Sequence, residues 1–219
     1  MSVGTKVSPF TRVLLVRHGQ TEWNVQGRFQ GHMDSPLTPV GVEQARVTGE
    51  RLRRAFQLDA IYSSDLPRAA QTAKLLAEGT GIGVTVDERL RERNFGIFEG
   101  KNFDEMRETH PIEFDLMRNG GGDYVIPGGE SKLQVLRRLH SFIDEIPEQH
   151  EGKTVLLVSH GGTLNIMMKA MLHLPPETAT NWEMLNLNLS QLIHRKEPHP
   201  GWKVRTIGDV SHLEAAGLI

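Results

Sequence analysis

The chain has no cysteine, no long hydrophobic run and no large excess of charge, and each absence excludes a class of protein. Without cysteine there can be no disulfide, Fe–S cluster or thiolate chemistry. Its longest apolar stretches, such as Val155 to Val158, fall far short of the roughly 20 residues that a membrane helix needs. With 27 acidic and 25 basic residues, the formal charge is −2. We therefore expect no nucleic-acid or membrane partner.

What is present is typical of a soluble globular protein. The 219 residues are 38% hydrophobic and 24% charged, and a chain of this length can bury a sizeable core. We expect one domain over residues 1–219. The first eleven residues hold one lysine and no long apolar run, so they do not resemble a secretory signal. A cytoplasmic location is the resulting expectation.

Strand-like and helix-like segments alternate along the chain. Apolar runs predict buried strands at residues 13–16, 60–62 and 154–159, an edge strand at 84–86, and two closing strands at 187–194 and 203–207. Helices are expected from Thr38-Pro39, from the cap candidates Ser64 and Asp65 to Gly79, and over residues 162–172. This order predicts an α/β fold: a three-layer αβα sandwich around a mostly parallel sheet.

The middle of the chain departs from this alternation. Asn102 and Glu105 have the spacing of a helix capping box, Pro111 interrupts that helix, and a glycine-rich loop spans residues 119–129. We interpret residues 102–127 as a small cap inserted into the main domain. A long amphipathic helix should follow from Ser131, with an inward face formed by Leu133, Leu136, His140, Ile143 and Ile146.

Two predicted strands end in the same dipeptide. Arg17-His18-Gly19 follows the first strand, and Ser159-His160-Gly161 follows the strand at 154–159. In open α/β sheets, ligands bind beyond the carboxyl ends of the strands. Arg68, in the first turn of a helix after another strand, opposes the helix macrodipole unless an anion lies there. These residues predict a phosphate-sized anion site, because guanidinium groups donate paired hydrogen bonds to phosphate oxygens.

Phosphoryl transfer at such a site needs a nucleophile and an acid. A neutral imidazole can attack phosphorus, and a carboxylic acid can protonate the departing oxygen. The loop at residues 90–100 offers Glu92 and Glu99, and we favour Glu92 because it is closer to the preceding strand. The alternative for Glu92 is a solvated carboxylate flanked by Arg91 and Arg93. For Glu99 a structural contact is the better interpretation.

Nine sequence blocks together resemble a known family. They read RHGQTEWN at residues 17–24, GRFQG at 27–31, PLT at 36–38, SSDLPRAAQTA at 63–73, LRE at 90–92, FG and EG at 95–96 and 99–100, PGGES at 127–131, and VSHGG at 158–162. In this order, the blocks are similar to the histidine phosphatase superfamily, in its phosphoglycerate mutase-like branch. The resemblance covers most of the chain.

The resemblance implies a role for each matched residue. His18 would be phosphorylated during turnover, Arg17, Arg68 and His160 would hold the phosphoryl group, and Glu92 would be the proton donor. Further contacts with phosphate or substrate are implied at Thr21, Asn24, Gln30 and the Gly161 amide. Similar family members need neither a metal nor another cofactor, and the sequence has no HxH or HExxH spacing.

Three functions stay open. The first is a metal-independent phosphomonoester hydrolase that acts on a small phosphorylated metabolite through phosphohistidine. The second is a cofactor-dependent phosphoglycerate mutase, which would use the same His18 and return the phosphoryl group to a sugar acid. The short interval between Glu92 and His160 disfavours it, because the mutases have a longer insertion there. The third is a non-catalytic phospho-ligand binding protein. The oligomeric state is open, with a homodimer as one option.

Overall fold

The computed structural model describes residues 10–197 and 201–219. Residues 1–9, which make up most of the N-terminal segment that does not resemble a secretory signal, lie outside the described residues. Within the described ranges, no helix is both long enough and apolar enough to cross a bilayer.

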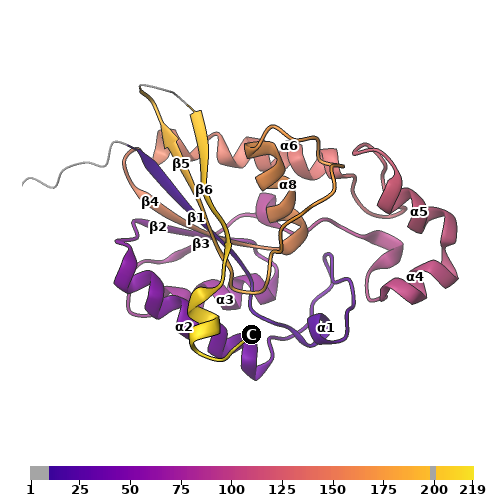
Figure 1. The fold of residues 1–219 in the computed structure, drawn as a ribbon, viewed down its shortest axis with the longest axis horizontal. Coiled ribbons are helices and arrows are strands. Elements are labelled where there is room, and N and C mark those ends of the chain that lie inside the picture. The colour runs from indigo at the N-terminus through magenta and orange to yellow at the C-terminus, as the bar shows by residue number, and fades with distance from the viewer. Residues whose placement is uncertain (1–9, 198–200) are drawn as a thin grey trace, which may run out of the picture.

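A six-stranded sheet in the order β3-β2-β4-β1-β5-β6 forms the centre of the molecule (Figure 1). Four strands are parallel: β1 (Thr11–Arg17), β2 (Ala60–Ser63), β3 (Val84–Val86) and β4 (Thr154–Ser159). Of the last two, β5 (Leu189–Arg195) pairs with β1 and β6 (Gly201–Asp209) pairs with β5, each in antiparallel fashion. The predicted mostly parallel sheet is confirmed, with β3 at its edge.

Helices cover both faces of this sheet. One face carries α2 (Pro39–Ala55), α3 (Pro67–Ala77) and α9 (Ser211–Ala215), and the other carries α6 (Lys132–Ile143) and α8 (Gly161–Met171) (Figure 1). Along β1, Leu14 and Val16 pack into the first layer, whereas Val13 and Leu15 pack into the second. Because both faces of the strand are buried, its sequence is continuously apolar. The three-layer αβα sandwich is confirmed.

The remaining elements are short. Residues 21–38 form a loop containing α1 (Glu22–Val25), and two 3₁₀ turns, Glu88–Leu90 and Gly96–Phe98, follow β3. Helices α4 (Phe103–Thr109) and α5 (Pro111–Asn119) project at one end of the molecule (Figure 1). The Asn102–Glu105 capping box is present at α4. These two helices have a hydrophobic cluster of their own, formed by Phe98, Met106, Phe114, Met117 and Ile126.

Two details of the predicted helices are wrong. Neither Ser64 nor Asp65 caps α3: its N-cap is Leu66, with no side-chain cap bond, and the Ser64 hydroxyl accepts from the Leu66 amide instead. Helix α6 ends at Ile143, before the short α7 (Ile146–Gln149). Of the predicted inward residues, Ile143 and Ile146 are buried and Leu136 packs against the same core, but Leu133 is only half-buried and His140 is exposed. The buried face of α6 itself consists of Val135, Leu139, Phe142 and Ile143. The face that contains Val135 and Leu139 buries more apolar surface than the face that contains His140, so the helix packs with the former against the core.

Candidate active site

The two His-Gly dipeptides meet where the central strands β1 and β4 end, at the carboxyl-terminal side of the sheet. Strands β1 and β4 are parallel neighbours with Arg17 opposite Ser159, so His18 and His160 leave the sheet side by side. Their ring centroids are 5.2 Å apart, and both side chains are buried. The repeated dipeptide thus forms one site from two distant parts of the chain.

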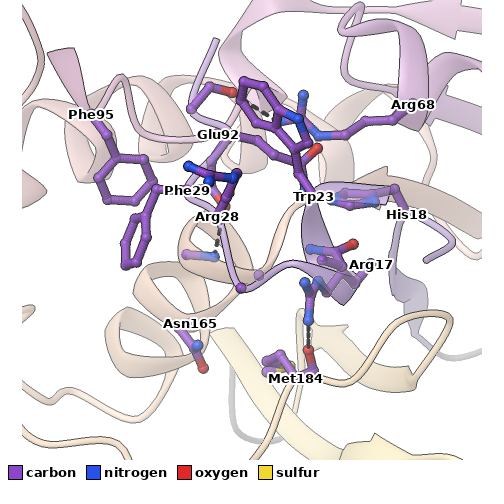
Figure 2. Close-up of a pocket in the computed structure, with 16 residues that line it drawn as sticks. Arg17, His18, Trp23, Arg28, Phe29, Arg68, Glu92, Phe95, Asn165 and Met184 are labelled. Atoms are coloured by element: carbon purple, nitrogen blue, oxygen red, sulfur yellow. Dashed lines mark hydrogen bonds between the residues drawn. The ribbon is translucent and has the colours of Figure 1, made fainter. Parts of the chain in front are cut away.

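A cavity of about 350 Å³ opens at this side of the sheet; we call it the reaction cavity. Of the residues implied by the family resemblance, those that line it are Arg17, His18, Asn24, Gln30, Arg68, Glu92 and Gly161. Figure 2 shows Arg17, His18, Arg68 and Glu92 gathered around it. His160 and Thr21 lie outside its lining. Among the described residues, neither ring nitrogen of His160 has a hydrogen-bond partner.

The environment of His18 produces a neutral imidazole with a free lone pair. Nδ1 lies 2.8 Å from the Gly19 carbonyl oxygen. A carbonyl can only accept, so the neutral ring carries its proton on Nδ1 and leaves Nε2 unprotonated. Burial, followed by the charges of Arg68 and Arg17, lowers the pKa of His18 well below its usual value. Nε2 therefore has the electronic state that an attack on phosphorus needs.

Arg17 and Arg68 are fixed by backbone carbonyl groups. Arg17 Nη1 donates to Met184 O at 2.7 Å, and Arg68 donates from Nη1 to Met33 O at 2.9 Å and from Nη2 to Gly31 O at 2.8 Å (Figure 2 shows the first bond). In the part of the chain that the structure describes, the buried Nε of each arginine has no partner. Buried donors without acceptors are costly. A phosphoryl group in the reaction cavity would supply the missing acceptors.

Glu92 is held at the start of α8. Its Oε1 accepts from the Arg93 and Thr163 amides at 2.8 and 2.9 Å, and lies 3.0 Å from the Thr163 hydroxyl. Its Oε2 accepts from the Gly162 amide at 2.9 Å. The side chain is buried, so the alternative of a solvated carboxylate is wrong. Oε2 accepts a single protein bond and retains a position for a transferable proton.

Glycine at residue 162 allows the close approach of this carboxylate. A Cβ atom there would lie 2.7 Å from Glu92 Oε1 and 3.2 Å from Oε2. Any larger residue would push the carboxylate away from the helix amides. The second glycine of the VSHGG block thus leaves room for the acid.

The loop that carries Glu92 is clamped by residues that the sequence analysis did not assign. Arg138 on α6 donates to the carbonyl oxygens of Arg89, Arg91 and Glu92 at 2.8, 2.7 and 3.0 Å. His32 Nε2 lies 2.9 Å from the Glu92 carbonyl oxygen. Neither residue has a local sequence signal, because the contacts depend on tertiary structure.

The loop after β1 is also organised by side chains. Thr21 is fully buried; its hydroxyl accepts from the Asn24 amide and from Gln30 Nε2, the latter at 2.8 Å. Thr21 thus positions Asn24 and Gln30, which line the reaction cavity, and does not line it itself. Asn186, which was not predicted, donates to the His18 carbonyl at 2.8 Å and to Asn24 Oδ1 at 3.2 Å.

Glu99 and Arg28 also hold loops together. Glu99 accepts from the backbone amides of His32, Met33 and Phe95, which fits the structural contact expected for it. Arg28 forms a paired salt bridge with Glu105 at 2.8 and 3.1 Å, and so ties the loop after β1 to α4. Within residues 10–197 and 201–219, no three His, Asp or Glu side chains are grouped as metal ligands would be.

The fold and site define a class of protein. A sequence profile of the histidine phosphatase superfamily (branch 1) matches residues 13–209. The chain belongs to this superfamily and is therefore a phosphatase or a mutase.

Individual relatives point in both directions. "Probable phosphoglycerate mutase GpmB" from Salmonella choleraesuis (strain SC-B67) is 39% identical over 209 residues, covering 94% of this chain and 97% of the relative. The solved structure of Bacillus stearothermophilus YhfR has a TM-score of 0.85 at 37% identity, covering 93% of this chain and 99% of its own. A mycobacterial glucosyl-3-phosphoglycerate phosphatase in complex with VO3 has a TM-score of 0.76 at 31% identity, with coverages of 90% and 98%.

Proposed function

We propose that the protein is a metal-independent phosphomonoester hydrolase that acts on a small phosphorylated metabolite through a phosphohistidine intermediate. The observation that carries the proposal is the unprotonated Nε2 of His18 beside two buried arginines whose Nε donors have no acceptor among the described residues. Such an arrangement suits a tetrahedral dianion and an in-line nitrogen nucleophile.

The proposed reaction has two balanced steps. His18 Nε2 attacks phosphorus while the ester P–O bond breaks, and Glu92 gives its proton to the leaving oxygen, which departs as an alcohol. Glu92, now a carboxylate, takes a proton from water as the water oxygen attacks the phosphohistidine. The N–P bond then breaks, which releases inorganic phosphate and restores neutral His18. Arg17 and Arg68 line the reaction cavity and would hold the phosphoryl oxygens through both steps. His160, whose ring is 5.2 Å from that of His18 and whose nitrogens have no partner among the described residues, would add a further contact.

A phosphoglycerate mutase is the second candidate, because relatives at 39% identity carry that name. In a mutase, the phosphoryl group would pass from His18 to a hydroxyl of a sugar acid instead of water. The names of solved phosphatases at 31% identity favour hydrolysis, as does the short interval between Glu92 and His160.

One pair of assays separates the two candidates. Phosphate release from a panel of phosphorylated metabolites is measured beside conversion of 3-phosphoglycerate to 2-phosphoglycerate. We expect phosphate release from at least one metabolite, with a kcat/KM well above the kcat/KM for conversion of 3-phosphoglycerate to 2-phosphoglycerate. Efficient interconversion of the phosphoglycerates with negligible phosphate release would contradict the proposal.

A further inference from the structure

A second cavity of about 440 Å³ adjoins the reaction cavity, and four residues line both: Phe29, Phe95, Gly162 and Asn165. Figure 2 shows Phe29 and Phe95 on the side of the reaction cavity away from His18. We call this second space the annex. The two cavities therefore have a common border, and the annex is the space next to the reaction cavity into which a substrate held beside His18 would extend.

Four cationic side chains line the annex: Arg93, Arg118 on α5, Lys132 on α6 and Lys169 on α8. Among the described residues, none of the four forms a salt bridge within 4.0 Å. Arg93 and Lys169 are only 4% and 7% exposed. Charged groups are seldom buried without a partner of opposite charge, so Arg93 and Lys169 are unusual; Lys132 is half-buried and Arg118 is exposed.

The hydrogen bonds of these cations go to neutral groups. Arg93 donates to the carbonyl oxygens of Glu130 and Tyr124 at 2.8 and 3.3 Å, and Lys169 donates to Pro176 O at 3.2 Å. Carbonyl groups orient the cations without cancelling their charge.

The nearby carboxylates do not balance this charge. Of those that attract Arg93, Glu92 is engaged by the α8 amides and Glu130 is paired with Arg138. Glu177 attracts both lysines. Glu177 is thus the one unengaged carboxylate that acts on the two lysines among the described residues.

The cations also repel one another. Burial, followed by the charge of Arg93, lowers the pKa of Lys132; burial, followed by the charge of Lys132, lowers the pKa of Lys169. Burial lowers the pKa of Arg93 to about 10. An anion in the annex would relieve this repulsion and replace lost hydration.

The rest of the lining is largely apolar. Phe29 packs edge-to-face against Phe95 and Phe103, with ring centroids 4.9 and 5.1 Å apart, and Met117 and Ile166 complete this surface. Asn165 is oriented by Trp182, whose indole nitrogen donates to its Oδ1 at 2.8 Å. An uncharged portion of a ligand can lie along these rings, as in most small-molecule sites.

We propose that the annex binds a second anionic group, a carboxylate or a phosphate, at the far end of the substrate, joined to the reacting phosphomonoester by an uncharged portion lying along the phenylalanine rings. This inference rests on the proposed function and narrows its substrate class. It distinguishes the preferred substrate from a simple alkyl or aryl monophosphate.

The test compares matched substrates. Alkyl monophosphates of several chain lengths are assayed beside the same chains ended by a carboxylate or by a second phosphate. At the best length, wild type should favour the doubly anionic substrate by about tenfold in kcat/KM, the worth of one charge-assisted hydrogen bond. The better of the two end groups identifies the anion. Equal kcat/KM values for all three end groups at every length would overturn the inference.

Lys132→Gln is the informative variant, because the Lys132 side chain has no hydrogen bond or salt bridge with any residue that the structure describes. The ratio of kcat/KM between doubly and singly anionic substrates should fall about tenfold, and Arg118→Gln should lower it in the same direction. Lys74→Gln, an exposed site on α3 outside both cavities, is the matched control and should keep the wild-type ratio. An unchanged ratio in both annex variants would overturn the assignment.

Failure of the proposed function gives a different result. In that case no phosphomonoester releases phosphate, and calorimetric titration with an alkane bisphosphate replaces the kinetic readout. Tighter binding of the bisphosphate than of the alkyl monophosphate, lost in Lys132→Gln, would still support the annex. Equal binding of the two would overturn it.

Discussion

At the scale of single residues, burial and neighbouring charge act on His18 in the same direction. Both favour the neutral imidazole and lower its pKa well below the ordinary value of about 6.5. Since protonation would remove the Nε2 lone pair, a lowered pKa extends the nucleophilic form toward acid pH.

The first prediction concerns this titration. As pH falls through about 6.5, the imidazole of His18 in the free protein should stay neutral and take up a proton only well below that value. A ¹⁵N-histidine NMR titration measures this directly, with the His18 signals assigned by their loss in His18→Ala. A midpoint near 6.5 for His18 would contradict the prediction.

A second prediction concerns the acid. Glu92→Gln keeps the size of the side chain and removes its transferable proton. We expect kcat/KM for an alkyl phosphate to fall about 10²-fold or more, and that for an aryl phosphate by less than about tenfold, because only the alkoxide leaving group needs protonation.

The control for this variant is structural. The amide nitrogen of glutamine cannot accept the bonds that Glu92 now receives from the helix amides. Thermal unfolding must therefore be measured in parallel. Equal losses for both esters in a folded variant would assign Glu92 a positioning role instead.

At the scale of elements, the N-terminus of α8 holds the Glu92 carboxylate beside the carboxyl ends of the central strands. The helix places the Gly162 and Thr163 amides on the Glu92 carboxylate, while Gly161 lines the reaction cavity. Amides at a helix N-terminus attract negative charge. In this protein the side chain of Glu92 uses two of them.

The third prediction tests this packing with Gly162→Ala. The new Cβ would lie 2.7 Å from Glu92 Oε1, so the carboxylate must move, and kcat/KM for alkyl phosphates should fall about tenfold or more. Gly83→Ala is the matched control, since no atom lies within 4 Å of a Cβ built there. Wild-type kinetics in Gly162→Ala would refute the close approach.

Most elements could be predicted from the sequence, and the exceptions have physical causes. Strands β1 and β4 are continuously apolar because helices cover both faces, so their sequences are distinctive. Helix α6 carries two overlapping apolar stripes, and the choice of Val135 and Leu139 over Leu133 and His140 depends on what the helix packs against. The start of α3 depends on Pro67 at its first turn, a stronger signal than the hydroxyl of Ser64.

At the scale of the whole molecule, the net charge of −2 gives no indication of a site for an anion. The two cavities instead collect cations from many parts of the chain, including Arg17, Arg68, Arg93 and Lys132. Local concentration of charge determines ligand binding, and composition reports only the sum.

The candidate site was predictable where its residues lie in contiguous blocks. Arg17, His18, Arg68 and Glu92 lie in such blocks and line one cavity. The Met184 carbonyl and Asn186 come from the segment between α8 and β5, which has no local motif. Their contacts with Arg17 and His18 exist only because β1 and β5 pair.

The fourth prediction concerns the intact protein without added metal. After dialysis against EDTA and assay in its presence, phosphate release from an aryl phosphate should stay within about twofold of the untreated rate. The chemistry we propose needs only side chains of this chain, with arginines in place of a metal ion to neutralise the phosphoryl oxygens. Loss of activity with EDTA, restored by a divalent cation, would refute metal independence.

The most direct test of the central claim is covalent labelling of His18. After a brief exposure to a ³²P-labelled phosphomonoester and quenching in base, wild type should carry acid-labile, base-stable label on the peptide that contains His18, and His18→Ala should carry none. Persistence of the same label in a folded His18→Ala variant would place the nucleophile elsewhere and contradict the account.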